Sequence, residues 1–427
     1  MSAGLLHSCL ACALLINSAV HAASGDLDAT FHPPLGYTTQ AFDLGGNNTD
    51  SVQSVLVQPG GGIVLVGTAT VDAATSQIAL VRLLPDGTLD SSFGTGGSTH
   101  VLVSETLLQP SVTGAALDAN GSIYVVGYVL DANYHAFIGH FLSNGKLDTG
   151  FGTAGFNVSN ASYPLLFRNV AVDANGKPVV VGAIVTEVLA YRFTTSGMFD
   201  PTFSGFEQNI GTGSGPIDSA WSVTFDSSGR IYLGAEAGTG GGNPQLENPA
   251  MVRLTSTGLI DNTCNGNGVV AFTDFSQYFL NPLSILFRDA HHVILSGSQG
   301  LNGSLYAVDF DADDCTVKSG QVLGGAESNS GHAVVASDGA VYVSYTSTAS
   351  SPAAAQILAL HDGLPYAGQA FTTSAGKISQ GTGIALVGGR PLQAIQQQVS
   401  GTNFDFAVAR FQNDRIFYAN FDRDAPN

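Results

Sequence analysis

The sequence predicts an all-β protein, a seven-bladed β-propeller of four-stranded antiparallel blades that is closed by an N-terminal strand completing the last blade. Three observations support this prediction. A hairpin motif recurs along the chain, apolar runs alternate with Gly-rich turns, and the motif is broken into two halves at the chain ends. Closing the modules into a ring removes the exposed sheet edges that a linear array would leave.

The recurring motif first appears as PDGTLDSSFGTGG at Pro85–Gly97. Its later copies are SNGKLDTGFGTAG (Ser143–Gly155), TSGMFDPTFSG (Thr195–Gly205) and STGLIDNTCNGNG (Ser256–Gly268). The modules that contain them span roughly 55 residues each. Repetition at this period predicts stacked supersecondary units in one domain, residues 25–427, rather than several unrelated domains.

In the first module, alternating apolar residues predict strands at Val52–Val57, Ile63–Thr68, Gln77–Leu84 and Ser98–Val103. Matching pairs of apolar runs recur at 115–127 and 136–145, 170–182 and 189–197, 223–234 and 250–258, 285–297 and 305–315, 333–344 and 356–363, and 384–395 and 406–414. Asp118–Gly121 and Asp173–Gly176 join the first two strands of their modules. Their Asn-Gly pairs predict two-residue type I′ hairpins.

The two ends of the chain predict how the ring closes. The seventh module stops soon after Arg410–Phe421, and no fourth strand follows it. Leu27–Phe31, LDATF, is the tail of a motif, and a strand at Tyr37–Phe42 comes after it. We therefore expect Tyr37–Phe42 to form the outermost strand of the last blade.

Composition narrows the classes of partner. The net charge is −19 with only 14 Lys and Arg residues, so DNA and RNA are not expected partners.

Residues 1–22 are expected to be a signal peptide, because the apolar run Leu10–Val20 leads to the small-residue site Val20–Ala22. No later segment is long and apolar enough to be a transmembrane helix. We expect an exported monomer, periplasmic or extracellular.

Two cysteines, Cys264 and Cys315, follow the signal peptide. An even number in an oxidising compartment allows one disulfide between them. The alternative is two separate buried thiols, because sequence does not show whether their Cα atoms approach within bonding distance.

The motif also carries a family resemblance. An Arg followed by Leu-Asp-x-x-Phe-Gly-x-x-Gly resembles the delta-60 repeat of bacterial exported proteins. Gly87–Gly97 and Gly145–Gly155 are close matches, and Thr195–Gly205 and Ser256–Gly268 are partial ones. The resemblance implies a propeller-like β architecture and brings no activity with it.

Basic and acidic residues recur at a fixed spacing within the motif. Arg82, Arg192, Arg253 and Arg410 occupy one place in the third strand, and His140 takes that place in the second module. Asp90, Asp200, Asp261 and Asp148 each follow eight residues later. We expect a repeated ion pair that holds the loop between strands three and four, rather than a repeated ligand site.

A candidate metal site lies in the fifth module. Asp309, Asp311 and Asp313 stand at alternate positions, like the first half of a calcium loop whose hard oxygen ligands suit Ca²⁺. Asp314 stands where such a loop has glycine, and Gly320 where it has its bidentate Glu. Calcium is therefore one alternative, and a solvated acidic hairpin is the other.

Candidate ligand residues fall on the loops that join blades and the loops that join strands two and three: Tyr163, Asp218, Asn243 and Glu247. Arg168 and Trp221 occupy equivalent places at the start of strand one, near the expected channel mouth. The equivalent places elsewhere are Gln53, Thr113, Leu283, Gly331 and Gly381. Trp221 could stack on a sugar or pack between blades.

The sequence after the expected signal peptide contains no Gly-x-Ser-x-Gly, His-Glu-x-x-His, Cys-x-x-Cys or phosphate-binding glycine motif. We therefore expect a secreted, non-enzymatic module that binds a protein or glycan or supports the cell surface. The alternative is a lactonase- or lyase-like propeller enzyme with its active site at the channel mouth. That alternative requires polar residues to converge there.

Overall fold

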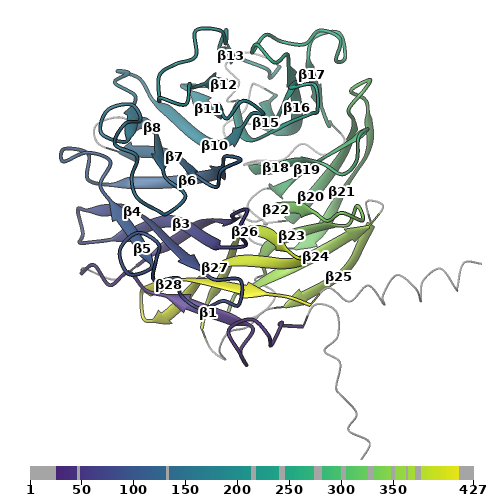
Figure 1. Cartoon of the computed structure of the whole chain (residues 1–427). Helices are drawn as coiled ribbons and strands as arrows, with labels where there is room; N and C mark the ends of the chain where they lie inside the picture. Colours follow the sequence, from purple (N-terminus) through teal and green to yellow (C-terminus); the bar gives the residue numbers. More distant parts are fainter. Residues whose placement is uncertain are drawn as a thin grey trace, which may run out of the picture.

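The computed structural model describes residues 26–45, 49–130, 134–212, 218–239, 246–273, 281–299, 304–325, 331–347, 352–361, 364–370 and 377–412. These residues form 28 strands in seven four-stranded antiparallel sheets. The sheets are arranged as blades around a central axis (Figure 1). The predicted seven-bladed propeller is therefore confirmed. The signal-peptide prediction lies outside the described residues.

The first four blades follow the chain in order. They comprise β2 (Ser51–Val57), β3 (Ile63–Thr70), β4 (Ser76–Leu83) and β5 (Ser98–Val101); then β6 (Pro110–Leu117), β7 (Ile123–Leu130), β8 (Tyr134–Phe141) and β9 (Phe156–Val158). The next two comprise β10 (Leu165–Val172), β11 (Pro178–Ile184), β12 (Glu187–Arg192) and β13 (Phe206–Gln208); then β14 (Ser219–Phe225), β15 (Ile231–Gly238), β16 (Glu247–Leu254) and β17 (Val269–Ala271).

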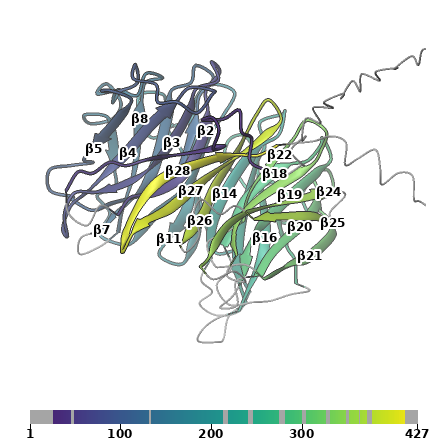
Figure 2. The ribbon, with the colours of Figure 1, turned by 90° about the horizontal axis from the view of Figure 1, so that it is seen from below.

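Blades five and six comprise β18 (Asn281–Phe287), β19 (His292–Gln299), β20 (Ser304–Asp311) and β21 (Val317–Gly325); then β22 (His332–Val335), β23 (Val341–Ser347), β24 (Ala354–His361) and β25 (Leu364–Ala370). Blade seven has the order β1 (Tyr37–Gln40), β28 (Asn403–Arg410), β27 (Arg390–Ser400) and β26 (Ser379–Val387). In the turned view of Figure 2, the purple β2–β4 lie beside the yellow β26–β28, where the first and last blades meet.

The ring closes as the split motif predicts. Strand β1 pairs antiparallel with β28, with Tyr37 opposite Ala409, and forms the edge of the last blade (Figure 1). The motif tail completes the last module in a second way. The Asp28 carboxylate accepts a hydrogen bond from Arg410 at 2.7 Å, and the Arg410 guanidinium lies 4.8 Å from the centre of the Phe31 ring. Phe421, the expected end of that motif, lies outside the described residues.

The expected ion pairs within the motif are present. Arg82, Arg192 and Arg253 contact the carboxylates of Asp90, Asp200 and Asp261 at 2.8, 2.8 and 2.9 Å, and His140 contacts Asp148 at 2.9 Å. Each arginine also donates to a carbonyl of the following blade. For Arg253 this carbonyl belongs to Ala312, at 2.7 Å. The repeated pair therefore joins neighbouring blades as well as holding its own loop.

The motif phenylalanine packs under a glycine of the next blade. A Cβ atom added at Gly145 would lie 2.5 Å from the Phe93 ring, and Gly145 has a φ of +83°. Gly87, Gly197 and Gly258 meet Phe31, Phe151 and Phe203 in the same manner. Only glycine allows this close approach together with left-handed backbone.

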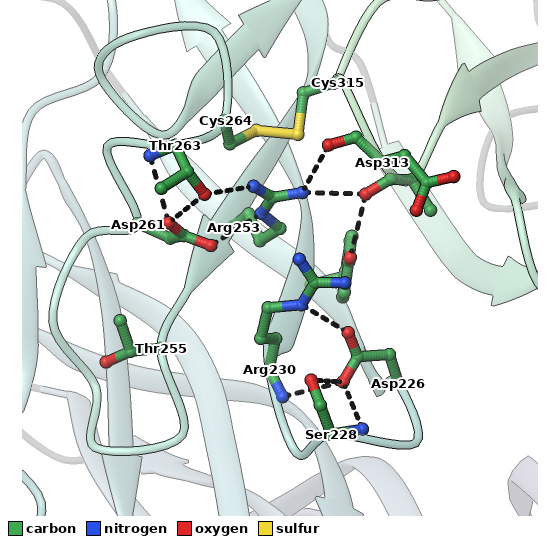
Figure 3. A network of polar contacts seen from close by, with 12 residues as sticks. Asp226, Ser228, Arg230, Arg253, Thr255, Asp261, Thr263, Cys264, Asp313 and Cys315 are labelled. Carbon is green, nitrogen blue, oxygen red and sulfur yellow. Dashed lines mark hydrogen bonds and ion pairs between the residues drawn. A yellow bond between two sulfur atoms is a disulfide. The ribbon is translucent and has the colours of Figure 1, made fainter.

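The junction between blades four and five uses a disulfide instead. Cys264 follows Asp261 by three residues, as Phe93 follows Asp90, and it bonds to Cys315 across a Cα–Cα distance of 5.2 Å (Figure 3). Cys315 has a φ of +60°, so it takes the left-handed place that glycine holds in other copies. The structure thus contains the disulfide, one of the two alternatives considered for these cysteines.

The expected type I′ hairpins are wrong. At Asp118–Gly121 only Gly121 has a positive φ, and its N–H donates to the carbonyl of Asp118 at 3.0 Å. The Asp118 carboxylate accepts from the N–H groups of Asn120 and Ser122 at 2.8 Å each. This side-chain hydrogen bonding favours a type I turn followed by a left-handed glycine, and the turn at Asp173–Gly176 has the same pattern.

Among the described residues, none forms a helix of the length and apolarity that crossing a membrane requires.

Candidate functional site at the channel mouth

A cavity of about 400 Å³ lies where the first strands of the blades surround the axis. Its lining is mostly hydroxyl and amide side chains, including Gln53, Asn169, Gln380 and Gln396. Tyr128, Trp221 and Leu283 add apolar surface, and Arg168 is the only Arg, Lys, Asp or Glu among the described lining residues. A second cavity of about 220 Å³ follows along the channel and shares part of this lining.

β-bulges direct the lining side chains. The pairing of first and second strands skips one residue at equivalent places in four consecutive blades, and the skipped residues are Gln53, Thr113, Arg168 and Trp221. All four line the cavity. A bulge leaves its extra residue outside the ladder and re-aims its side chain. These four predicted positions therefore do line the cavity, and so do Leu283 and Gly381. At the remaining predicted position, Gly331, the lining residue is instead the neighbouring His332.

Arg168 and Trp221 form one unit across the boundary of blades three and four. The Arg168 guanidinium carbon lies 3.7 Å from the centre of the indole, and Nε donates to the Ser219 hydroxyl at 3.3 Å. Such a contact holds a cation against an aromatic face. It also covers that face of Trp221, so the indole does not offer it to a sugar. Arg168 and Trp221, which the sequence placed at equivalent positions of strand one, are therefore in direct contact.

Two buried carboxyl groups stand behind this unit. Glu236 and Glu247 are only 6% and 8% exposed and lie on β15 and β16. Burial raises the pKa of Glu236 well above its ordinary value, and the charge of Glu247 adds to the rise, while Arg168 opposes it. Burial also lowers the pKa of Arg168, which Glu236 partly offsets. A raised carboxyl pKa favours the neutral form of Glu236 next to a charged guanidinium.

The other predicted ligand residues do not reach the cavity. Asp218 is fully buried, and its carboxylate accepts from the N–H groups of Ile210, Gly211 and Gly238, so it braces two loops. Glu247 is buried and absent from the lining. Tyr163 is 46% exposed and also lies outside the lining. Asn243 lies outside the described residues.

The three carboxylates of the candidate calcium site are not brought together. Asp309 pairs with Arg288 at 3.1 Å, Asp311 with Lys318 at 3.0 Å, and Asp313 with His291 at 2.6 Å. Each carboxylate therefore has its own basic partner. In the residues that the structure describes, no three His, Cys, Asp or Glu side chains are placed to hold a metal ion.

Several lining residues were not among the sequence-based candidates. Tyr128 comes from β7 and Gln396 from β27, the second strands of their blades, where they lie opposite Ser111 and Gln380 of the first strands. Burial lowers the pKa of His332 to about 4, so it is neutral at pH 7. Glu236 had a visible signal, because it is a carboxylate within the otherwise apolar IYLGAEAG of β15. The arrangement offers hydrogen bonds from neutral side chains and one positive charge.

Comparisons with known proteins add the following. Residues 58–93 match the family described as a domain of unknown function (DUF5122) beta-propeller. No curated protein sequence matches the chain.

Solved structures of similar fold include Trypanosoma rangeli sialidase in complex with the inhibitor DANA, at 8% identity and a TM-score of 0.48, covering 91% of this chain and 62% of that one. The polysaccharide lyase Uly1 is similar at 9% identity and a TM-score of 0.49, covering 84% and 89% of the two chains. Pseudomonas aeruginosa periplasmic gluconolactonase PpgL is similar at 10% identity and a TM-score of 0.43, covering 75% and 88%. The chain spans between 54% and 62% of the length of the first sialidase structures.

Proposed function

We propose that this is an exported, non-enzymatic binding protein that holds a small polar ligand in the cavity at its channel mouth. The observation that carries this proposal is the set of bulged first strands, which turn Gln53, Thr113, Arg168 and Trp221 into one cavity of about 400 Å³. A cavity of this volume falls within the range of small-molecule sites. The ligand is a free small molecule or the exposed end of a glycan or protein partner.

The alternative, a lactonase- or lyase-like enzyme, requires acid, base or metal-binding groups that converge on one point. The described lining has one histidine, His332, and no carboxylate. Glu236, which interacts electrostatically with Arg168, and its neighbour Glu247 are both buried and do not line the cavity. These features favour binding over catalysis.

Export and repeat identity are parts of the same proposal. The disulfide between Cys264 and Cys315 suits an oxidising compartment. We infer that the DUF5122 match at residues 58–93 marks one of seven delta-60-type repeats, because the Arg–Asp pair of that module recurs in blades three, four and seven.

A screen of glycans and metabolites on the mature protein tests the proposal. Trp221 is the one tryptophan of the chain and lines the cavity, so its fluorescence reports occupancy directly. We expect at least one compound both to change this emission and to raise the melting temperature. The Trp221→Phe variant should keep the thermal shift and lose the signal. A library that produces neither change, or shifts that Gln53→Ala and Gln396→Ala leave intact, would contradict a channel-mouth site.

A further inference from the structure

The arginines of the described residues separate into two groups. Seven of the eight contact a carboxylate: Arg82, Arg192, Arg230, Arg253, Arg288, Arg390 and Arg410. Arg168 is the exception. Within the described chain, the only hydrogen bond of its guanidinium is donated by Nε to the Ser219 hydroxyl. In a chain with a net charge of −19, an arginine that contacts no described carboxylate requires a specific explanation.

We propose that the channel mouth binds a sugar acid, a small polyhydroxylated carboxylate, with its carboxylate on the terminal N–H groups of Arg168. This inference rests on the proposed binding function and names the chemical class of the ligand. It is carried by the position of Arg168, which is the one Arg, Lys, Asp or Glu among the described lining residues and forms no ion pair with a described carboxylate.

The guanidinium is fixed before a ligand arrives. Trp221 supports one face at 3.7 Å, and Ser219 holds Nε at 3.3 Å. The four terminal N–H hydrogens of an arginine form a planar fork that matches the two oxygens of a carboxylate. Four motif arginines show the contrast, because in each of them NH1 and NH2 both donate to loop or neighbouring-blade oxygens: Arg82, Arg192, Arg253 and Arg410.

The groups around Arg168 do not neutralise the positive charge of its guanidinium. Glu236 is the carboxyl group that interacts most directly with Arg168, yet burial, assisted by Glu247, raises its pKa and favours its neutral form. Tyr128 and Tyr134 lie near Arg168 on the neighbouring blade, with their rings packed edge to face at 5.2 Å. A cation among neutral groups in a partly enclosed site attracts an anion more strongly than it would in water.

The opposite wall fits the rest of a sugar acid. The blades follow one another around the ring in chain order, so blades seven and one lie across the axis from blades three and four. That wall carries the amides of Gln53, Gln380 and Gln396, and none of the three has a hydrogen-bond partner among the described residues. Each amide offers both donors and an acceptor. A ligand held by Arg168 at one end would present its hydroxyl groups to these glutamines.

Titration calorimetry on the mature protein with D-galacturonate, D-glucuronate and D-gluconate tests the inference. Trp221 fluorescence is recorded in parallel. The matched neutral probe is methyl D-galacturonate ester, which keeps the ring and its hydroxyl groups and loses the charge. We expect at least one acid to bind and to change the Trp221 emission. We expect the ester of galacturonate, or the neutral parent sugar of the other acids, to bind at least 30-fold more weakly.

Variants separate this site from general charge effects. Arg168→Gln should weaken acid binding at least 30-fold, and Arg168→Lys should recover part of it because the charge returns without the planar fork. Arg230→Gln is the matched control, since it removes an arginine of blade four that pairs with Asp226 away from the cavity. It should leave binding unchanged.

The remaining outcomes decide between the two proposals. Equal binding of acid and neutral probe, or full binding by Arg168→Gln, would overturn the sugar-acid inference and leave a channel-mouth binding site standing. Failure of all three acids to bind would also overturn it. Whether the cavity binds any compound at all is decided separately by the broad screen.

Discussion

Replacing Asp28 by Asn should destabilise the closed ring more than the equivalent change at Asp90 destabilises its blade. The Asp28 side chain is fully buried, and one carboxylate oxygen accepts from both Arg410 and Arg390, at 2.7 and 2.6 Å. The other oxygen accepts from Thr30 and Gln412. Asparagine removes the charge and leaves Arg410 buried without a full counter-charge. Breaking a buried pair in this way costs about 3–5 kcal/mol.

Asp90→Asn is the matched control, because Asp90 and Arg82 form the same pair within a continuous blade. Their side chains are 15% and 16% exposed, so solvent can replace part of the lost interaction, and we expect a loss of about 1–2 kcal/mol. Urea unfolding followed by circular dichroism measures both variants. Hydrogen exchange should also show faster opening of β1 in Asp28→Asn alone. Equal losses in the two variants, or unchanged exchange in β1, would refute the reasoning that Asp28 holds the closure.

Three further predictions follow from the described contacts. Reducing the bond between Cys264 and Cys315, which lie 51 residues apart, should lower the free energy of unfolding by about 2–4 kcal/mol, measured by urea unfolding with and without reductant; an unchanged midpoint would contradict it. Gly145→Ala should lower the free energy of unfolding by about 2–4 kcal/mol, because the added Cβ meets the Phe93 ring. The control Gly96→Ala, where φ is +66° and the space is open, should lower it by about 1 kcal/mol. Similar losses in the two variants would contradict this prediction. The neutral His332 should make the protein lose about 1–3 kcal/mol as the pH falls from about 6.5 towards 4, since its pKa in the folded state is lowered to about 4. His332→Gln should lack this loss in melts at each pH.

The fold was largely predictable because its determinants are local and repeated. Two motif copies place an Arg, an Asp eight residues later and a Phe three residues after that, and two more keep the frame with His140 for Arg or Cys264 for Phe. One alignment of the copies therefore predicts both the loops and their ion pairs. The broken copies at Leu27–Phe31 and near Arg410 predicted closure, since only a ring brings them together. Sequence did not show that Asp28 itself would pair with Arg410, because the two residues lie near opposite ends of the chain.

The site was only partly predictable. Arg168 and Trp221 were found because equivalent positions in repeated strands face the same place, yet their mutual stacking depends on bulges that leave no mark in hydrophobic periodicity. Asp218 looked like a ligand residue because polar loop residues often are, but its carboxylate satisfies three backbone N–H groups. Such a demand for hydrogen bonds appears only once the loops are folded.

A crystal structure of the mature protein grown with D-galacturonate would show directly whether Arg168 holds a sugar acid. We expect electron density for the sugar acid in the cavity, with its carboxylate within hydrogen-bond distance of the Arg168 terminal nitrogens and its hydroxyl groups towards Gln53, Gln380 and Gln396. A sugar acid bound with its carboxylate away from Arg168, or an empty cavity at saturating ligand, would contradict it.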